Sequence, residues 1–346
     1  MGRKKIAVLL GCAAMSCLFT GCQNTGAERV KNIKIGVTVY DQYDTFISQL
    51  VDQFNLYAAE LSDSADSDIS IKIEVYNAGK SQTTQNDQVK NLLDQDCDVI
   101  CVNLVDRTEP VTIIDMAEKQ DVPVIFFNRE LVEQDLERWD RLYYVGAKAL
   151  ESGILQGEMA ADLFTADPSV DKNGDGTFQY VILEGEMDHQ DAIVRTEYAV
   201  NTIVEHHVPV EKLGYAIADW NRGQAQTKMT QMIGQYGDAI ELVLANNDDM
   251  ALGAIDAYKA AGIEQEAWPA IFGIDGTDVG KTALGKGELK GTVYNDKEGQ
   301  AEAMLKLAMR LATGASLDDL HLEDGKYIRL PYTKLEQSMQ SEETGN

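Results

Sequence analysis

Basic residues are scarce in this 346-residue chain, where 30 lysines and arginines stand against 57 aspartates and glutamates and the formal net charge is −27 at pH 7. Nucleic acid and anionic lipid repel a surface of this kind. We therefore exclude DNA and RNA binding, and we attribute most of the excess charge to a solvated surface. The length allows two domains, each with its own core.

Cysteine is scarce as well, and two of the five cysteines, Cys97 and Cys101, fall in an apolar run that is typical of a strand. Four strand residues span about 13 Å, which is beyond the reach of a disulfide. Neither thiol has a histidine beside it in the sequence. We expect both to be packed, reduced side chains rather than metal ligands or nucleophiles.

The N-terminal apolar run, residues 6–19, is too short for a membrane-spanning helix. Basic residues at positions 3–5 precede it, and a glycine and Cys22 follow it, in the order typical of a bacterial lipoprotein signal. We predict a signal peptide over residues 1–21, lipidation of Cys22 and a tether over residues 22–31. The alternative is a plain secretory signal, since Phe19 stands where the lipoprotein cleavage box prefers leucine.

Motifs of common catalysts are missing too. No nucleophile elbow is present, and the segment GTDVGKT at 276–282 has one residue too few between its glycines for a phosphate-binding P-loop. His189 with Asp191, or pairs of carboxylates, could still act as acid and base. An enzyme is therefore kept as an alternative, although the prediction is a protein without catalytic residues.

What the chain does contain is an alternation of short apolar runs with stretches of helical spacing. Expected strands lie at 32–40, 70–79, 98–105, 122–128, 142–146, 178–183, 213–217, 241–245, 270–274, 289–293 and 327–330. Expected helices lie at 45–61, 82–93, 111–119, 150–163, 191–205, 224–233, 250–261, 279–284 and 300–311. Such β-α-β units form parallel sheets covered by helices on both faces. Because the strands are too many for one compact sheet, we predict an α/β fold of two doubly wound lobes.

Polar and aromatic side chains follow the carboxyl ends of these strands, where open α/β sheets bind their ligands. They are Asp44, Phe46, Asn103, Asn128, Arg129, Glu130, His189, Asp191, Arg195, Trp220, Asn246, Asn247, Asp248, Asp275, Asn295 and Asp296. Amides, carboxylates and arginine bind hydroxyl groups, and aromatic rings offer flat apolar faces. A pyranose has the matching surface. Each residue alone could simply cap a helix, but together they predict a sugar site between the lobes.

The segment DKNGDGTFQ at 171–179 carries calcium-binding residue types. The residues that match positions 1, 3, 5, 7 and 9 of an EF-hand loop are Asp171, Asn173, Asp175, Thr177 and Gln179. Position 12 is Ile182 instead of glutamate, and a strand follows instead of a helix, so the segment is not an EF-hand. A distant carboxylate could complete a calcium site; the alternative is an acidic turn capped by its own side chains.

From the first strand to Tyr332 the chain resembles the type I periplasmic sugar-binding family, and in particular its galactose- and glucose-binding members. The segments that carry the resemblance are KIGVTVYDQYDTF, VNLVD, VPVIFFNRE, YYVGA, DKNGDGTFQYVILEGE, HQDAIVRTEY, LANNDDMALGAIDA, FGIDG and GTVYND. The resemblance implies two Rossmann-like lobes joined by a hinge of three segments. We expect an N-terminal lobe of residues 32–147 and 296–328, a C-terminal lobe of residues 148–295 and 329–338, and a flexible tail at 339–346.

The resemblance also implies roles for particular residues. The residues expected to contact the sugar are Asp44, Phe46, Asn103, His189, Asp191, Arg195, Trp220, Asn247, Asp275 and Asn295. Phe46 and Trp220 would stack on the two sugar faces, and Asp44 would accept from the 4-hydroxyl, at which glucose and galactose differ. A structural calcium ion would be held by the loop residues named above and by Glu241, a remote bidentate ligand.

The resemblance therefore implies a monomeric, lipid-anchored protein outside the cytoplasm that binds D-glucose or D-galactose and delivers it to an ABC permease and ATPase. A second possibility is a sensor that presents bound sugar to a membrane chemoreceptor or kinase. A transcription regulator of the same two-lobe fold would need an N-terminal helix-turn-helix, against which the signal-like start and the acidic charge argue.

Overall fold

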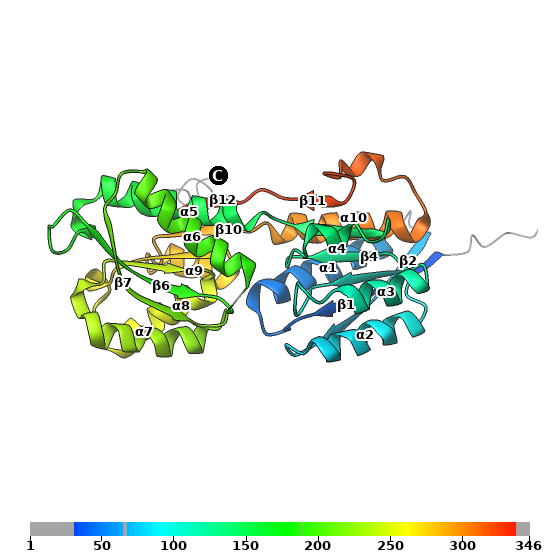
Figure 1. The fold of residues 1–346 in the computed structure, drawn as a ribbon, viewed down its shortest axis with the longest axis horizontal. Coiled ribbons are helices and arrows are strands. Elements are labelled where there is room, and N and C mark those ends of the chain that lie inside the picture. The colour runs from blue at the N-terminus through cyan, green and yellow to red at the C-terminus, as the bar shows by residue number, and fades with distance from the viewer. Residues whose placement is uncertain (1–30, 65–67, 188, 337–346) are drawn as a thin grey trace, which may run out of the picture.

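The structure, a computed structural model, describes residues 31–64, 68–187 and 189–336 and consists of two lobes that lie side by side (Figure 1). The predicted signal peptide, Cys22 and the predicted tail lie outside these residues. Each lobe contains one six-stranded sheet, with strand orders β11-β5-β4-β3-β1-β2 and β12-β10-β9-β8-β6-β7. The prediction of two α/β lobes is confirmed.

The N-terminal lobe is built from the first five strands and one late strand. Its strands are β1 (Lys31–Val39), β2 (Ile69–Asn77), β3 (Val99–Val102), β4 (Val124–Phe127), β5 (Leu142–Gly146) and β11 (Tyr327–Arg329). Its helices are α1 (Thr45–Asp63), α2 (Gln82–Asp94), α3 (Val111–Lys119), α4 (Glu133–Leu136) and α10 (Lys297–Thr313). All pairings in this sheet are parallel.

The C-terminal lobe repeats this plan. Its strands are β6 (Phe178–Glu184), β7 (Val210–Ile217), β8 (Leu242–Ala245), β9 (Ala270–Asp275), β10 (Gly291–Tyr294) and β12 (Thr333–Glu336). Its helices are α5 (Ala149–Ala166), α6 (Gln190–Glu205), α7 (Arg222–Tyr236), α8 (Asp248–Ala260) and α9 (Asp278–Gly285). The edge strand β12 pairs with β10 in the antiparallel sense, and it was not among the predicted strands.

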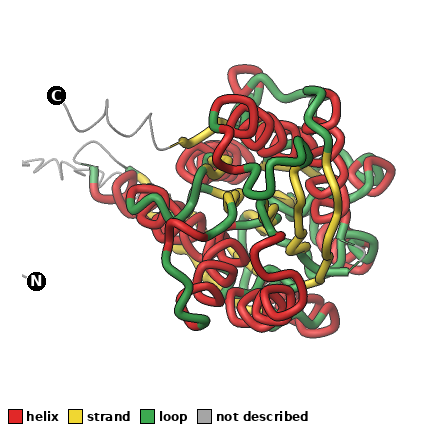
Figure 2. The backbone as a smooth tube through the Cα atoms, turned by 90° about the vertical axis from the view of Figure 1, so that its left-hand side faces the viewer, coloured by secondary structure: helices red, strands yellow, loops and turns green. Residues whose placement is uncertain are grey.

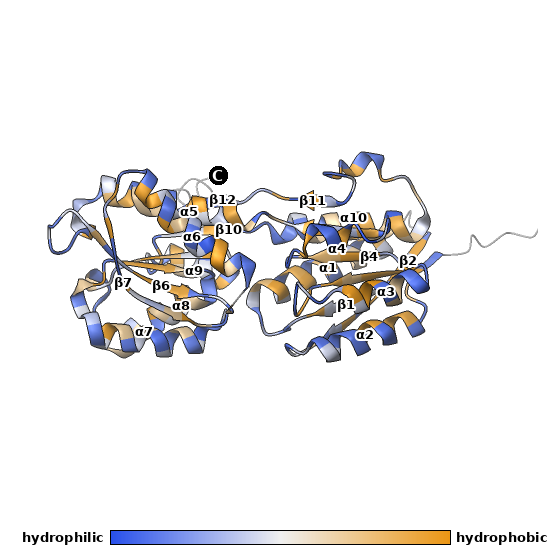
Figure 3. Cartoon of the chain, viewed as in Figure 1, coloured by the Kyte–Doolittle hydropathy of each residue, from blue (hydrophilic) through white to orange (hydrophobic). Residues whose placement is uncertain are grey.

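Hydrophobic cores lie on both faces of each sheet. In the N-terminal lobe, Ile35 and Val37 of β1 belong to the cluster under α1 and α10, whereas Ile100 and Val102 of β3 belong to the cluster under α2 and α3. Figure 3 shows the apolar strands inside and polar outer helix faces, and Figure 2 shows the helices around the strands. This burial explains why the strands appear in the sequence as near-continuous apolar runs. Cys97 and Cys101 are buried and free, as predicted.

The chain passes between the lobes three times, after β5, after β10 and after β11. The crossings lie beside one another because β11 pairs with β5 and β12 pairs with β10. A connection of this kind permits the lobes to rotate as rigid bodies about one side of the molecule. In the part of the chain that the structure describes, no helix is long and apolar enough to cross a membrane.

Candidate functional site

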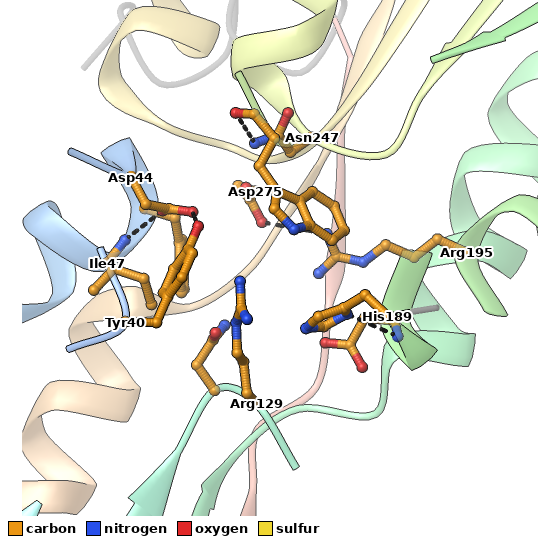
Figure 4. A pocket seen from close by; sticks show the side chains of 12 residues that line it. Tyr40, Asp44, Ile47, Arg129, His189, Arg195, Asn247 and Asp275 are labelled. Atoms are coloured by element: carbon orange, nitrogen blue, oxygen red, sulfur yellow. Dashed lines mark hydrogen bonds and ion pairs between the residues drawn. The ribbon is translucent and has the colours of Figure 1, made fainter. Parts of the chain in front are cut away.

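A pocket lies between the two lobes, at the carboxyl ends of the parallel strands (Figure 4). About 350 Å³ of space free of protein atoms, part of it open to solvent, lies among its lining residues. The residues that line it are Tyr40, Asp44, Phe46, Ile47, Asn128, Arg129, His189, Asp191, Arg195, Trp220, Asn247 and Asp275. Each lobe supplies half of this lining.

Helix caps fix several of these side chains. Asp44 caps α1 by accepting from the Ile47 N–H at 2.9 Å, and Asn247 caps α8 by accepting from the Met250 N–H at 2.9 Å. The second carboxylate oxygen of Asp44 accepts from the Tyr40 hydroxyl at 2.5 Å. Asp44 is thus held from two sides while it lines the pocket, so the capping and binding interpretations of this residue are both compatible with the structure.

His189 is a neutral hydrogen-bond donor in this pocket. Its Nδ1 accepts from the Asp191 N–H at 3.2 Å, so the ring proton lies on Nε2. Nε2 is buried and has no hydrogen-bond partner. Burial, assisted by Arg129, Arg195 and Arg107, lowers the pKa of His189 to about 2. The imidazole is therefore uncharged at neutral pH and can donate from Nε2 to a ligand oxygen.

This low pKa predicts a pH-dependent stability. The pKa of His189 is lower in the folded state than its unfolded value of about 6.5. Below that pH the unfolded chain binds a proton at this histidine that the folded chain does not, so the free energy of unfolding falls as the pH falls. Asparagine at this position would cap α6 without titrating. We expect wild type to lose about 2 kcal/mol of unfolding free energy relative to His189→Asn between pH 7 and pH 5, measured by urea denaturation. Parallel pH profiles for the two proteins would show that His189 is not held neutral.

Arg195 and Trp220, which also line the pocket, carry further buried donors without partners. Two nitrogens of the Arg195 guanidinium donate to the Asn246 carbonyl at 2.8 Å and to the Tyr332 hydroxyl at 3.3 Å, whereas its Nε has no partner. The indole Nε1 of Trp220 has none either. A Cβ atom on Gly185 would come within 2.2 Å of the Trp220 ring, so only glycine at position 185 permits this position of the indole.

Carboxylates balance these donors. Asp275 lies 3.9 Å from Arg195, and burial raises the pKa of Asp275 well above its usual value. Burial also raises the pKa of Asp191. A ligand that meets this lining must both accept from buried N–H groups and donate to carboxylates. Hydroxyl groups do both, and the apolar surfaces of Phe46 and Trp220 suit the C–H-rich faces of a sugar ring.

Side-chain contacts beside residues of the pocket lining join the lobes. The Thr45 hydroxyl at the start of α1 donates to Asp249 of α8 at 2.7 Å. Arg129 and Lys80 of the N-terminal lobe lie 2.9 Å and 3.4 Å from the Glu186 carboxylate of the C-terminal lobe. The Arg129 guanidinium also lies 3.5 Å from the centre of the Tyr40 ring. The lobes are therefore closed on one another at the pocket.

The structure brings all the predicted sugar-site residues into this pocket except Asn103 and Asn295. Asn103 is fully buried behind it and donates to Asn128 at 3.2 Å. Asn295 accepts from Gln300 at 2.6 Å within the second crossing. Direct contact of either with a ligand stays a prediction. Asn128 and Arg129, which were among the polar residues expected after strand ends, also line the pocket, whereas nothing in the sequence singled out Tyr40.

The calcium-like segment forms a tight loop at the opposite end of β6. Asp171 accepts from the backbone N–H groups of Gly174 and Gly176, both at 2.8 Å. Glu241, which is 1% exposed, reaches this loop and accepts from the Lys172 N–H at 2.6 Å and the Gln179 N–H at 3.2 Å. The remote carboxylate thus contacts the loop, and carboxylate and amide oxygens are of the donor type that calcium prefers.

The same loop is also satisfied by its own hydrogen bonds. Asn173 accepts from the Asp175 N–H at 2.8 Å, and Asp175 accepts from the Thr177 N–H at 2.8 Å and from the Gln179 side chain at 2.9 Å. Within residues 31–64, 68–187 and 189–336, no three His, Cys, Asp or Glu side chains are gathered as a metal site. The donor types and their order fit calcium, while the geometry is that of an acidic turn.

Residues 35–316 of the chain match a protein family described as periplasmic binding protein domain. The chain is 34% identical over 333 residues to the D-galactose/methyl-galactoside binding periplasmic protein MglB of Haemophilus influenzae, a similarity that covers 95% of this chain and 96% of that protein. It is 27% identical to a xylitol-binding protein of Mycolicibacterium smegmatis, over 90% of this chain and 81% of the relative.

Among solved structures, an ABC transporter solute binding protein from Bacillus halodurans with bound myo-inositol is similar with a TM-score of 0.74. The two are 29% identical, and the superposition covers 92% of this chain and 99% of that one.

Proposed function

This chain belongs to the periplasmic binding protein family, as its resemblance predicted, and on that basis we propose that it binds D-galactose or D-glucose between its lobes and delivers the sugar to an ABC importer. The relative from Haemophilus influenzae, whose name specifies galactose and methyl-galactoside, supports this choice of ligand. Myo-inositol, which is bound in the similar solved structure, and xylitol, for which another relative is named, are also rich in hydroxyl groups.

The observation that carries the proposal is the set of buried donors without partners, His189 Nε2, Arg195 Nε and Trp220 Nε1. An unsatisfied buried N–H group costs about 1–3 kcal/mol. Three such groups beside buried carboxylates are stabilised when a ligand supplies oxygen atoms that accept and hydroxyls that donate. Because the two lobes contribute to one pocket, the ligand favours the closed arrangement over an open one.

A calorimetric titration with a panel of monosaccharides and cyclitols tests the proposal. We expect galactose or glucose to bind more tightly than ribose, xylitol and myo-inositol, without conversion to a product. If myo-inositol binds most tightly, the proposed ligand is a cyclitol instead of a hexose. Product formation from either hexose would overturn the transport function in favour of an enzyme.

We also propose that the loop at 171–179 and Glu241 bind a structural calcium ion. Bound calcium would tie the start of β6 to the start of β8 and would remove the repulsion among Asp171, Asp175 and Glu241. Since the ion would bind the folded chain selectively, it would raise the melting temperature.

Chelation is therefore expected to lower the melting temperature of wild type by several degrees, and added calcium should restore it. The Glu241→Gln protein, which lacks the remote carboxylate, should melt at a temperature that does not respond to calcium. Identical melting curves of wild type in EDTA and in calcium would show that the loop is an acidic turn without metal.

The lipid anchor at Cys22 completes the proposal, because an anchored carrier stays beside its permease in the membrane. A diacylglyceryl group adds about 0.8 kcal/mol per buried methylene, so two long chains hold firmly. Metabolic labelling with a lipid precursor should mark wild type and not Cys22→Ser. Release of wild type and Cys22→Ser into the medium in equal amounts would argue for a plain secretory signal.

A further inference from the structure

Asp248 is a fully buried carboxylate one residue beyond the pocket residue Asn247. It accepts three hydrogen bonds, from the Thr277 N–H at 2.7 Å, the Thr277 hydroxyl at 2.9 Å and the Thr292 hydroxyl at 2.5 Å. Burial raises the pKa of Asp248 to about 6, against the effect of these hydrogen bonds. A buried acid of this kind is costly, and the proposed sugar contacts do not use it.

Two glycines make room for this carboxylate. A Cβ atom on Gly273 would come within 2.3 Å of one Asp248 oxygen, and a Cβ atom on Gly280 would come within 2.1 Å of the other. Both glycines have ordinary backbone φ values, since neither is among the residues of positive φ. Glycine is therefore needed at these two positions because a larger side chain would collide with the Asp248 carboxylate.

The Asp248 carboxylate also sets the direction of two hydroxyl groups. Thr292 donates to it and accepts from the Gly276 N–H at 3.3 Å. Thr277 donates to it and accepts from the Gly280 N–H at 3.1 Å, which caps α9. Because each hydroxyl proton points at the carboxylate, each oxygen has lone pairs left for a backbone N–H. One side chain thus organises the turn that follows β9.

That turn holds a strained residue. Asp275, which lines the pocket, has a φ of +113°, and Gly276 follows at +61°. An aspartate with this φ lies outside the favoured backbone regions, at a cost of about 1–3 kcal/mol that the surroundings must offset. The Asp275 carbonyl accepts from the Asn295 N–H at 3.0 Å, so the same turn contacts the second crossing between the lobes.

We propose that Asp248 is a positioning residue of the ligand site, whose carboxylate holds the turn 275–277 in the conformation that directs Asp275 into the pocket. This inference rests on the proposed sugar-binding function. Asp248 does not itself line the pocket, so its effect on a ligand passes through Asp275.

The test is a double-mutant cycle on the affinity for the tightest-binding hexose. Asp248→Asn preserves the shape but places an amide beside the Thr277 N–H or the Thr292 hydroxyl, so we expect the Kd to rise roughly 10- to 30-fold. In an Asp275→Asn background the same change should alter the Kd less than threefold, because the group that it positions is already lost. Equal effects in both backgrounds would overturn the inference.

Ile113→Ala is the control for a loss of stability alone. It removes a fully buried side chain from the cluster under α2 and α3 in the N-terminal lobe, to which no residue of the pocket lining belongs. Its Kd should match that of wild type. If Asp248→Asn does not fold, Thr292→Val replaces it in the cycle, because it removes the hydroxyl between Asp248 and Gly276.

A crystal structure of the Asp248→Asn protein tests the conformation of Asp275 without relying on sugar binding. We expect Asp275 to leave its positive φ and its side chain to leave the pocket. An unchanged Asp275 would overturn the inference even if no hexose binds wild type, whereas failure of wild type to bind any of the panel would overturn the proposed function alone.

Discussion

Replacing Asp44 by asparagine should weaken hexose binding roughly 10- to 150-fold, which corresponds to the about 1.5–3 kcal/mol of a hydrogen bond to a charged group. Asparagine remains a good cap for α1, so the bond to the Ile47 N–H and the helix are preserved. The carboxylate that would accept from a sugar hydroxyl is lost. Calorimetry at fixed salt measures the change in Kd.

The ratio of the affinities for galactose and glucose tests the proposed role of Asp44 more directly. If Asp44 accepts from the 4-hydroxyl, the ratio of the two affinities should change in Asp44→Asn, because the two sugars differ only there. Asp41→Asn is the matched control, since Asp41 lies in the same loop, outside the pocket lining, and its nearest cation is Lys80 at 3.9 Å. A ratio that is the same in all three proteins would place Asp44 away from the 4-hydroxyl.

Replacing Trp220 by alanine should raise the Kd about 100-fold or more and lower stability by about 3–5 kcal/mol. The indole is 9% exposed and packs over Gly185 and edge-on to His189, with a ring separation of 5.4 Å. Its removal takes away an apolar face of the pocket and the packing that orients His189. Trp220→Phe retains a ring and should recover most of the stability but less of the affinity.

Fluorescence separates the two effects of Trp220. The chain has three tryptophans, and of these Trp220 alone lines the pocket. Wild type and Trp268→Phe should show a change of emission on sugar addition, and Trp220→Phe should not. A full signal in Trp220→Phe would mean that the sugar binds away from this ring.

The fold was largely predictable because parallel strands buried on both faces leave a strong pattern of short apolar runs. The strand β12 was missed, since its sequence TKLE has only one apolar residue and it lies at an antiparallel edge. The starts of α1 and α2 were predicted correctly, but several other helix starts were placed late. The helix α10, for example, begins at Lys297 because Asp296 accepts from the Gly299 N–H at 2.8 Å.

The site was predictable to the extent that polar residues follow strands. Sequence position does not tell which of these side chains face the pocket and which support it from behind. Asn103 turns inward to Phe127 and Asn128, while Asn128 itself lines the pocket. The positive φ of Asp275 cannot be predicted from the residue type, because aspartate is not typical of this conformation. The glycines that accommodate Asp248 are present in the sequence, but their role becomes clear only from the structure.

The interleaving of the two lobes along the chain sets a limit on when either can fold during synthesis. The N-terminal lobe needs α10, whose Ala301, Met304 and Leu307 are fully buried in its core. The C-terminal lobe needs β10 and β12 to complete its sheet. Domains usually fold as units while the chain emerges, but here neither sheet is complete until its last strand, β11 or β12, has been made.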